Sequence, residues 1–212
     1  MIKQYKGPLG NFQYDDREFK LENNRLYYIG TETDGSKIKI PKGIRNCDYM
    51  FSVCSSLLKA PEIPTGVTHC HAMFYGCSSL VETPEIPAGV TDCVSMFSGC
   101  ESLVEAPEIP KEVTECFYMF HDCSSLLTAP EIPVGVINCD GMFCGCRSLT
   151  KAPVIPEGVI DCDYIFSGCN SLQNYSLDNA TCRDEMYYRC PPIIQETDSF
   201  IQKFKERKQL NA

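Results

Sequence analysis

The residues best suited to chemistry in this chain are fifteen cysteines and three histidines. A cysteine thiolate binds metal ions, and it acts as a nucleophile when a base lies beside it. The run His69-Cys70-His71 has the residue types for either role, and His121 and Cys144 are further candidates. Whether any of them works depends on the elements that hold the side chains.

Twelve of the cysteines recur in two columns with a period of 23 residues. The columns are Cys47, Cys70, Cys93, Cys116, Cys139 and Cys162, and then Cys54, Cys77, Cys100, Cys123, Cys146 and Cys169. The spacing within a unit is Cys-x6-Cys, whereas zinc sites typically use Cys-x2-Cys. We therefore predict small apolar core residues with reduced thiols, and no metal or cofactor.

The same period places a phenylalanine and, before it, a methionine or isoleucine in every unit. The phenylalanines are Phe51, Phe74, Phe97, Phe120, Phe143 and Phe166. Cys47, Met50, Phe51 and Cys54 fall at i, i+3, i+4 and i+7, which predicts a short helix with both cysteines pointing inward. Residues adjacent on a helix do not face one another, so we expect no catalytic pair at Cys70. His121 and Cys144 fall at variable positions, where we expect the surface.

The rest of each unit is extended. A Ser-Leu pair follows the second cysteine, and a Pro-x-Ile-Pro box follows that pair; its prolines disfavour helix, so residues 57–64 and their equivalents predict a short strand. One unit cannot bury its own apolar face, but six stacked units can. The pattern predicts an α/β repeat solenoid with a glycine turn before each helix.

The Met-Phe-x-x-Cys-x-Ser-Leu box at a 23-residue period resembles the BspA-type leucine-rich repeats, over about residues 40 to 172. The resemblance implies a right-handed leucine-rich-repeat superhelix of six units whose short parallel strands form a sheet, used for binding rather than catalysis. This chain has Ala-Pro-x-Ile-Pro or Thr-Pro-x-Ile-Pro where an alternating aliphatic strand is more usual. Because proline cannot donate to a ladder, these boxes limit the length and regularity of the sheet.

We predict three regions, with a β cap over residues 1–44, the solenoid over 45–172 and a C-terminal cap over 173–212. Strand-like runs in the first region predict a small antiparallel meander; they are Phe12 to Tyr14, Phe19 to Leu21, Leu26 to Ile29 and Lys37 to Ile40. After Thr197-Asp198 an amphipathic helix carries Phe200, Ile201 and Phe204. That helix is interpreted either as a lid on the solenoid or as a free partner-binding element.

The formal net charge is -9, and because residues 199–212 sum to +3, residues 1–198 carry -12. This charge argues against direct nucleic-acid binding and favours a partner with a basic surface. The sequence has no apolar stretch of membrane-spanning length and no secretion signal, so we expect a cytoplasmic protein.

The sharpest candidate for binding is an acidic ladder, which we call the Glu row: Glu62, Glu85, Glu108 and Glu131. If the isoleucine beside each points inward, each carboxylate points outward. Coils about 5 Å apart would then hold like charges together at roughly 1 kcal/mol per pair in water. The row is either a solvated face or a surface for a basic partner. Tyr75, Phe117 and Tyr118, on the helix side, are further candidates for partner contact.

The first functional hypothesis is a non-enzymatic module that binds another protein. The second is a small acidic inhibitor, carried by a phage or mobile element, that blocks a basic nucleic-acid-binding protein such as a defence nuclease in the manner of an anti-CRISPR protein. A fragment of a surface adhesin is a weaker alternative, and an enzyme with a nucleophilic cysteine is the weakest. No catalytic residue is assigned.

Overall fold

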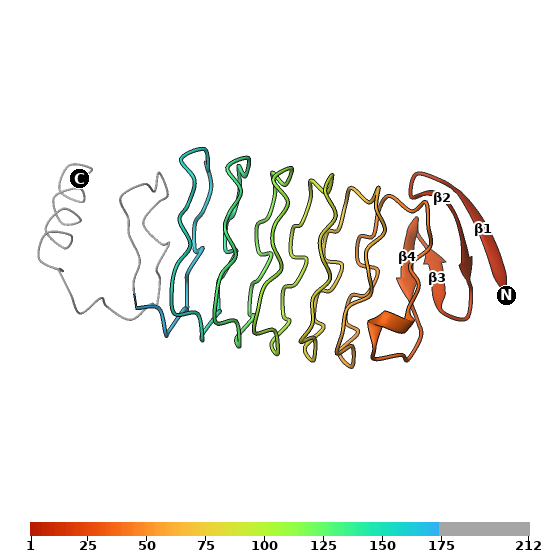
Figure 1. Ribbon diagram of the computed structural model, residues 1–212, viewed down its shortest axis with the longest axis horizontal. Coiled ribbons are helices and arrows are strands. Elements are labelled where there is room, and N and C mark those ends of the chain that lie inside the picture. The colour runs from red at the N-terminus through yellow and green to blue at the C-terminus, as the bar shows by residue number, and fades with distance from the viewer. Residues whose placement is uncertain (174–212) are drawn as a thin grey trace, which may run out of the picture.

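The computed structural model describes residues 1–173 and shows a solenoid whose successive coils stack along one axis (Figure 1). Its named elements lie at the N-terminal end. They are β1 (Ile2–Gly7), β2 (Gly10–Asp15), β3 (Phe19–Glu22), β4 (Arg25–Tyr28) and a 3-10 helix, η1 (Gly35–Lys37). The predicted C-terminal cap and its helix lie outside the described residues.

The N-terminal cap consists of two antiparallel hairpins, β1 with β2 and β3 with β4, rather than one meander. Strand β1 was not predicted, and Lys37 to Ile40 does not form the predicted strand. The Asp34 carboxylate instead accepts a hydrogen bond from the Ser36 backbone N–H at 3.1 Å, which caps η1. Phe19 is buried and packs edge-on against Phe51, so the cap covers the apolar end of the first coil.

The helices predicted over residues 47–54 and their equivalents are wrong, because this part of each coil is a run of turns. Tyr49 and Val53 have φ values of 59° and 63°, in the left-handed region that interrupts a helix. Every second N–H in the run bonds to the next coil; for example, the Tyr49 N–H donates to the His71 carbonyl at 2.9 Å. The N–H groups between them bond back within their own coil. The cysteines still point inward, because the run places the same side chains on one side.

The predicted strands are reduced to isolated parallel bridges, such as Lys59 with Glu82 and Glu105 with Thr128. Each Pro-x-Ile-Pro box lacks two N–H donors, which explains why no longer ladder forms. A second line of parallel bridges runs along the turn side, where helix was predicted. It joins Asn46, His69, Asp92, Glu115, Asn138 and Asp161. Backbone pairing between coils therefore runs along both long sides of the solenoid.

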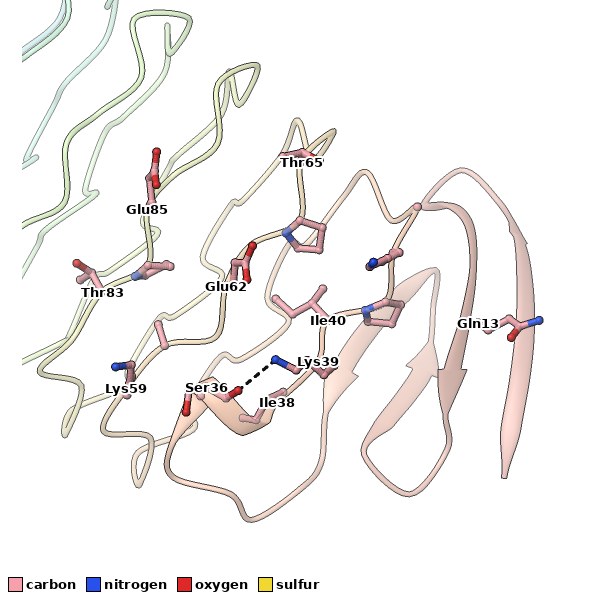
Figure 2. Close-up of a pocket in the computed structure, with 17 residues that line it drawn as sticks. Gln13, Ser36, Ile38, Lys39, Ile40, Lys59, Glu62, Thr65, Thr83 and Glu85 are labelled. Carbon is pink, nitrogen blue, oxygen red and sulfur yellow. Dashed lines mark hydrogen bonds between the residues drawn. The ribbon is translucent and has the colours of Figure 1, made fainter.

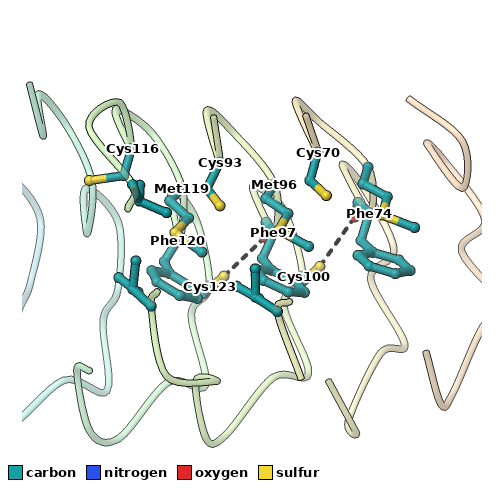
Figure 3. Close-up of a cluster of buried hydrophobic side chains, with 14 of the residues drawn as sticks. Cys70, Phe74, Cys93, Met96, Phe97, Cys100, Cys116, Met119, Phe120 and Cys123 are labelled. Atoms are coloured by element: carbon teal, nitrogen blue, oxygen red, sulfur yellow. Dashed lines mark hydrogen bonds between the residues drawn. The ribbon is translucent and has the colours of Figure 1, made fainter. Parts of the chain in front are cut away.

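The core is a stack of phenylalanine rings between these two sides. Successive rings from Phe51 to Phe166 lie nearly parallel, with centroids 5.5 to 5.8 Å apart, and all six are fully buried. The second cysteine column lies beside them. The Cys123 thiol donates to the Phe97 carbonyl of the preceding coil at 3.1 Å, and Cys100 bonds to Phe74 in the same way (Figure 3). These cysteines thus satisfy buried carbonyls as well as filling space.

Candidate functional site

The Glu row lies on the long side of the solenoid that carries the Pro-x-Ile-Pro boxes, which we call the Glu face. The four carboxylates are exposed, while the isoleucine after each is buried, from Ile63 to Ile132. The alternation arises because neighbouring residues in an extended chain point to opposite sides. Figure 2 shows Glu62 and Glu85 on neighbouring coils. The outward orientation predicted for the row is therefore confirmed.

A groove follows this side of the molecule. Its first part has a volume of about 1120 Å³ and is bounded by the N-terminal cap and the first two coils. Both apolar and polar residues line it, the polar ones including Gln13, Ser36, Thr65 and Thr83. A second hollow shares Thr83, Pro84 and Glu85 with the first and continues past Glu108. Glu62, Glu85 and Glu108 thus line two adjoining hollows, and Glu131 lies beyond them.

None of the four carboxylates has an ion pair or a side-chain hydrogen bond within residues 1–173. The neighbouring column differs, because Lys59 pairs with Glu82 at 2.7 Å across adjacent coils. At the cap end, Lys39 occupies the position of the row one unit before Glu62, and its ammonium donates to the Ser36 carbonyl (Figure 2). Lys39 therefore precedes the Glu row at the cap end and bonds within the cap, whereas the four carboxylates make no such bond within residues 1–173.

Charge is divided along the chain. Residues 1–45 contain nine Lys and Arg against six Asp and Glu, a net +3, whereas residues 46–173 contain four against sixteen, a net -12. The four basic residues of the repeats are Lys59, Lys111, Arg147 and Lys151. A surface with this excess of carboxylates attracts cationic partners and speeds their encounter.

The aromatic residues predicted for partner contact lie on the turn side, across the core from the Glu row. Tyr75 is 46% exposed and Tyr118 is 37% exposed. Phe117 meets Tyr118 edge-on at 6.0 Å between ring centroids, and the Tyr118 ring lies over Gly141 of the next coil, where an added Cβ would clash. The structure therefore does not bring Tyr75, Phe117 and Tyr118 together with the Glu row.

The histidine candidates do not form a nucleophile and base pair. The Cys70 side chain is fully buried, and this burial raises the pKa of its thiol far above the ordinary value. His69 bonds through Nδ1 to the Thr68 hydroxyl, and His71 through Nε2 to the Tyr49 hydroxyl, both at 2.8 Å. His121 lies 3.2 Å from Asp122. Among the described residues, no group of three or more His, Cys, Asp or Glu side chains is placed to hold a metal ion.

Eleven of the twelve column cysteines are buried, and eleven of the twelve are reduced. Cys54 is only half-buried. Cys162 departs from the predicted reduced state, since it is disulfide-bonded, whereas the other eleven are free. Cys144, which was predicted to be exposed, is half-buried, and burial raises its pKa. These thiols belong to the packing of the repeats.

Sequence reasoning missed one surface feature next to the groove. Leu58, Val81, Val104 and Leu127 occupy the same position in four successive coils and are 41% to 50% exposed. The signal was present in the aligned repeats, because the residue after the inward-pointing leucine is a large aliphatic in each of these four units. We call these four residues the aliphatic stripe.

The chain belongs to the BspA type Leucine rich repeat region (6 copies) family, whose profile matches residues 23–127 and 95–198. Leucine-rich-repeat proteins typically bind other proteins. A search of curated protein sequences gave no significant match. Among the residues that the structure describes, no helix is long and apolar enough to cross a membrane.

Solved structures with the same fold are bacterial leucine-rich-repeat proteins. A leucine-rich repeat protein from Bacteroides ovatus aligns with a TM-score of 0.60 at 19% identity, over 87% of this chain and 50% of that one. The T. pallidum leucine-rich repeat protein aligns with a TM-score of 0.50 at 24% identity, over 81% of this chain and 92% of that one. A leucine-rich cell surface protein from Faecalibacterium prausnitzii aligns with a TM-score of 0.51 at 23% identity, over 84% of this chain and 57% of that one. This chain thus spans about half of the B. ovatus protein. The hypothesis of a phage-borne inhibitor finds no support in these likenesses.

Proposed function

We propose that this chain is a binding module that recognises a basic surface of another protein through its Glu face. The observation that carries the proposal is the Glu row, four exposed carboxylates in one line that have no partner within residues 1–173 and of which three line the groove. Like charges about 5 Å apart repel each other, and the fold gains no bond from them in return. A cationic partner removes this repulsion and is drawn to the face by its potential.

The alternative surface, the turn side, is less suited to the role. Its aromatic residues contact one another or their neighbours, as Tyr118 does with His121 at 5.5 Å between rings. Several of its polar side chains make bonds within the solenoid; Asp48, for example, accepts a hydrogen bond from the His71 backbone N–H at 3.0 Å. These groups are already used by the fold, whereas those of the Glu row are not.

Site-specific photo-cross-linking in the native host tests this proposal. In one variant of the chain, a photoreactive amino acid replaces Glu85, in the groove. In a second variant, it replaces Glu115, on the turn side. We expect a discrete cross-linked protein from position 85 that is absent or much weaker from position 115, and mass spectrometry of the product should identify a lysine- or arginine-rich contact segment. Equal products from both positions, or none from position 85, would contradict the proposal.

A further inference from the structure

The aliphatic stripe is a second surface feature that the described part of the chain leaves exposed. Single exposed aliphatic side chains are common in proteins, but a continuous line of them marks an interaction surface. Leu58, Val81, Val104 and Leu127 are each 41% to 50% exposed, one on each of four neighbouring coils. The stacking of the coils makes them one continuous line.

At its first residue, Leu58, the stripe lies next to the groove that holds Glu62 and Glu85. Lys59, which follows Leu58 in the chain, lines this groove together with Glu62. Each aliphatic residue precedes the glutamate of its own coil by four residues, or about 13 Å of extended chain. The two lines therefore run side by side along the solenoid, with Lys59, Glu82 and Glu105 between them.

The two lines also have the same length. Units one to four carry both an aliphatic residue and a glutamate, and in the fifth unit both positions change, to Thr150 and Val154. At the other end, Lys39 of the cap stands in place of the glutamate. Within residues 1–173, no side-chain hydrogen bond or ion pair joins the two positions of a coil. A shared partner that carries a line of apolar groups beside a line of cations would account for their common limit.

The spacing of the coils indicates whether such a partner presents an α-helix or an extended chain. Equivalent rings of these four coils lie 5.5 to 5.7 Å apart, so four equivalent residues such as the Glu row span about 17 Å over three steps. An α-helix advances about 5.4 Å per turn, or about 16 Å over three turns, which long basic side chains can match. In an extended chain, side chains on one face recur every 6.7 Å or so, and three steps cover about 20 Å, which exceeds the row by about 3 Å. A helix is also about 10 to 12 Å wide, close to the distance between the two lines.

We propose that the Glu face docks an amphipathic basic α-helix of the partner protein, parallel to the solenoid axis, with its apolar stripe on the aliphatic stripe and its Lys or Arg stripe on the Glu row. This rests on the proposed function, because it takes the Glu face as the binding surface. Apolar contact supplies affinity, and the carboxylates set the orientation and the register. The Thr150 and Val154 unit marks the end of the contact.

A designed helical probe tests the docking directly. The probe is a stapled peptide of about four turns, with Leu at i, i+4, i+7 and i+11 and Lys one residue after each. Its binding to the full chain is followed by fluorescence anisotropy. We expect the Val81→Ser/Val104→Ser and Glu85→Gln/Glu108→Gln variants each to bind the probe about fivefold more weakly or worse.

Two matched variants serve as controls. Ile137→Ser/Ile160→Ser removes aliphatic residues that are 45% and 77% exposed at another position of the coil. Glu115→Gln/Asp161→Asn removes two charges on the turn side. Both should bind the probe as the wild type does, and circular dichroism should show that all four variants fold. A second probe carries the same residues in strict Leu-Lys alternation, the pattern of a strand, and it should bind more weakly than the helical one.

The docking is overturned if the helical probe does not bind, if the alternating probe binds as tightly, or if the Val81→Ser/Val104→Ser variant retains wild-type affinity. These results are distinguishable from a failure of the proposed function. If the helical probe fails while the cross-link from position 85 persists, the Glu face binds a protein but not a helix. If the cross-link from position 85 is also lost, the Glu face is not the binding surface.

Discussion

Replacing Phe97 by alanine should show how far the stability of the solenoid depends on its ring stack. Phe97 is fully buried, and its ring is nearly parallel to Phe74 and Phe120, with centroids 5.6 and 5.7 Å away. Emptying a buried aromatic site costs about 3 to 5 kcal/mol. Each ring pair contributes about 0.5 to 1.5 kcal/mol beyond burial alone, so the two pairs account for about 1 to 3 kcal/mol of this cost.

A Phe97→Leu variant separates the two contributions. It retains most of the apolar volume but loses both ring pairs, so it should lose about 1 to 3 kcal/mol and lie between the wild type and Phe97→Ala. Urea unfolding of the full chain, followed by tyrosine fluorescence and by circular dichroism, measures these differences. The chain contains eleven tyrosines and no tryptophan, so tyrosine is the intrinsic probe.

Tyr75→Ala is the control, because Tyr75 lies on the turn side and is 46% exposed. It is a better control than Ser98, which follows Phe97 but is itself buried. Removal of this exposed ring should change the free energy of unfolding by less than about 1 kcal/mol. If Phe97→Ala costs no more than Tyr75→Ala, the ring stack is not the core that holds the coils together.

Three further predictions concern the backbone and the thiols. Val53 has a φ of 63° and is 68% exposed, and four later units have glycine at its position. Because glycine adopts a positive φ without strain, Val53→Gly should raise the free energy of unfolding by about 1 kcal/mol in urea titrations, whereas Val53→Ala should not raise it. A thiol reagent should label Cys54 and Cys144 before the buried Cys100 and Cys123, and simultaneous labelling of all four would show that the columns are open. Burial raises the pKa of Cys139 from an ordinary 9.0 to about 12, so the stability that it contributes is complete below pH 9 and is lost as the pH rises toward 12. In unfolding measurements between pH 9 and 10, Cys139→Ala should reduce this loss by about 1 kcal/mol, and an unchanged slope would mean that Cys139 is accessible to water.

The repeat pattern was enough to predict the core, because one side chain type recurs at each inward position. The 23-residue period by itself identifies the phenylalanine and cysteine columns, and the buried isoleucine beside each glutamate gives the orientation of the Glu row. Inward positions at i, i+3, i+4 and i+7 did not, however, establish a helix. A run of turns that bonds to the next coil buries the same four residues.

The sequence did contain a signal against the helix. Gly76, Gly99, Gly145 and Gly168 share the position of Val53, and glycine inside a helix is unfavourable. A recurrent glycine indicates a left-handed backbone instead, which all four residues adopt. The bonds between coils were beyond sequence reasoning, because they join residues 22 positions apart. The aliphatic stripe was missed for another reason: its residues are of the same types as core residues, and only their exposure distinguishes them.

The most direct test of the central claim is the affinity of the Glu face for the protein that is cross-linked from position 85. Biolayer interferometry compares the wild type with Glu62→Gln/Glu85→Gln/Glu108→Gln/Glu131→Gln and with a charge-matched variant, Glu18→Gln/Glu22→Gln/Glu115→Gln/Asp161→Asn, over a range of salt concentrations. We predict that the first variant binds about tenfold more weakly or worse, mainly through a slower on-rate, while the second keeps nearly wild-type affinity. Wild-type binding should weaken as the Debye length falls to about 8 Å. Equal affinities for the two variants would contradict the claim, because binding would then depend on net charge rather than on the Glu row.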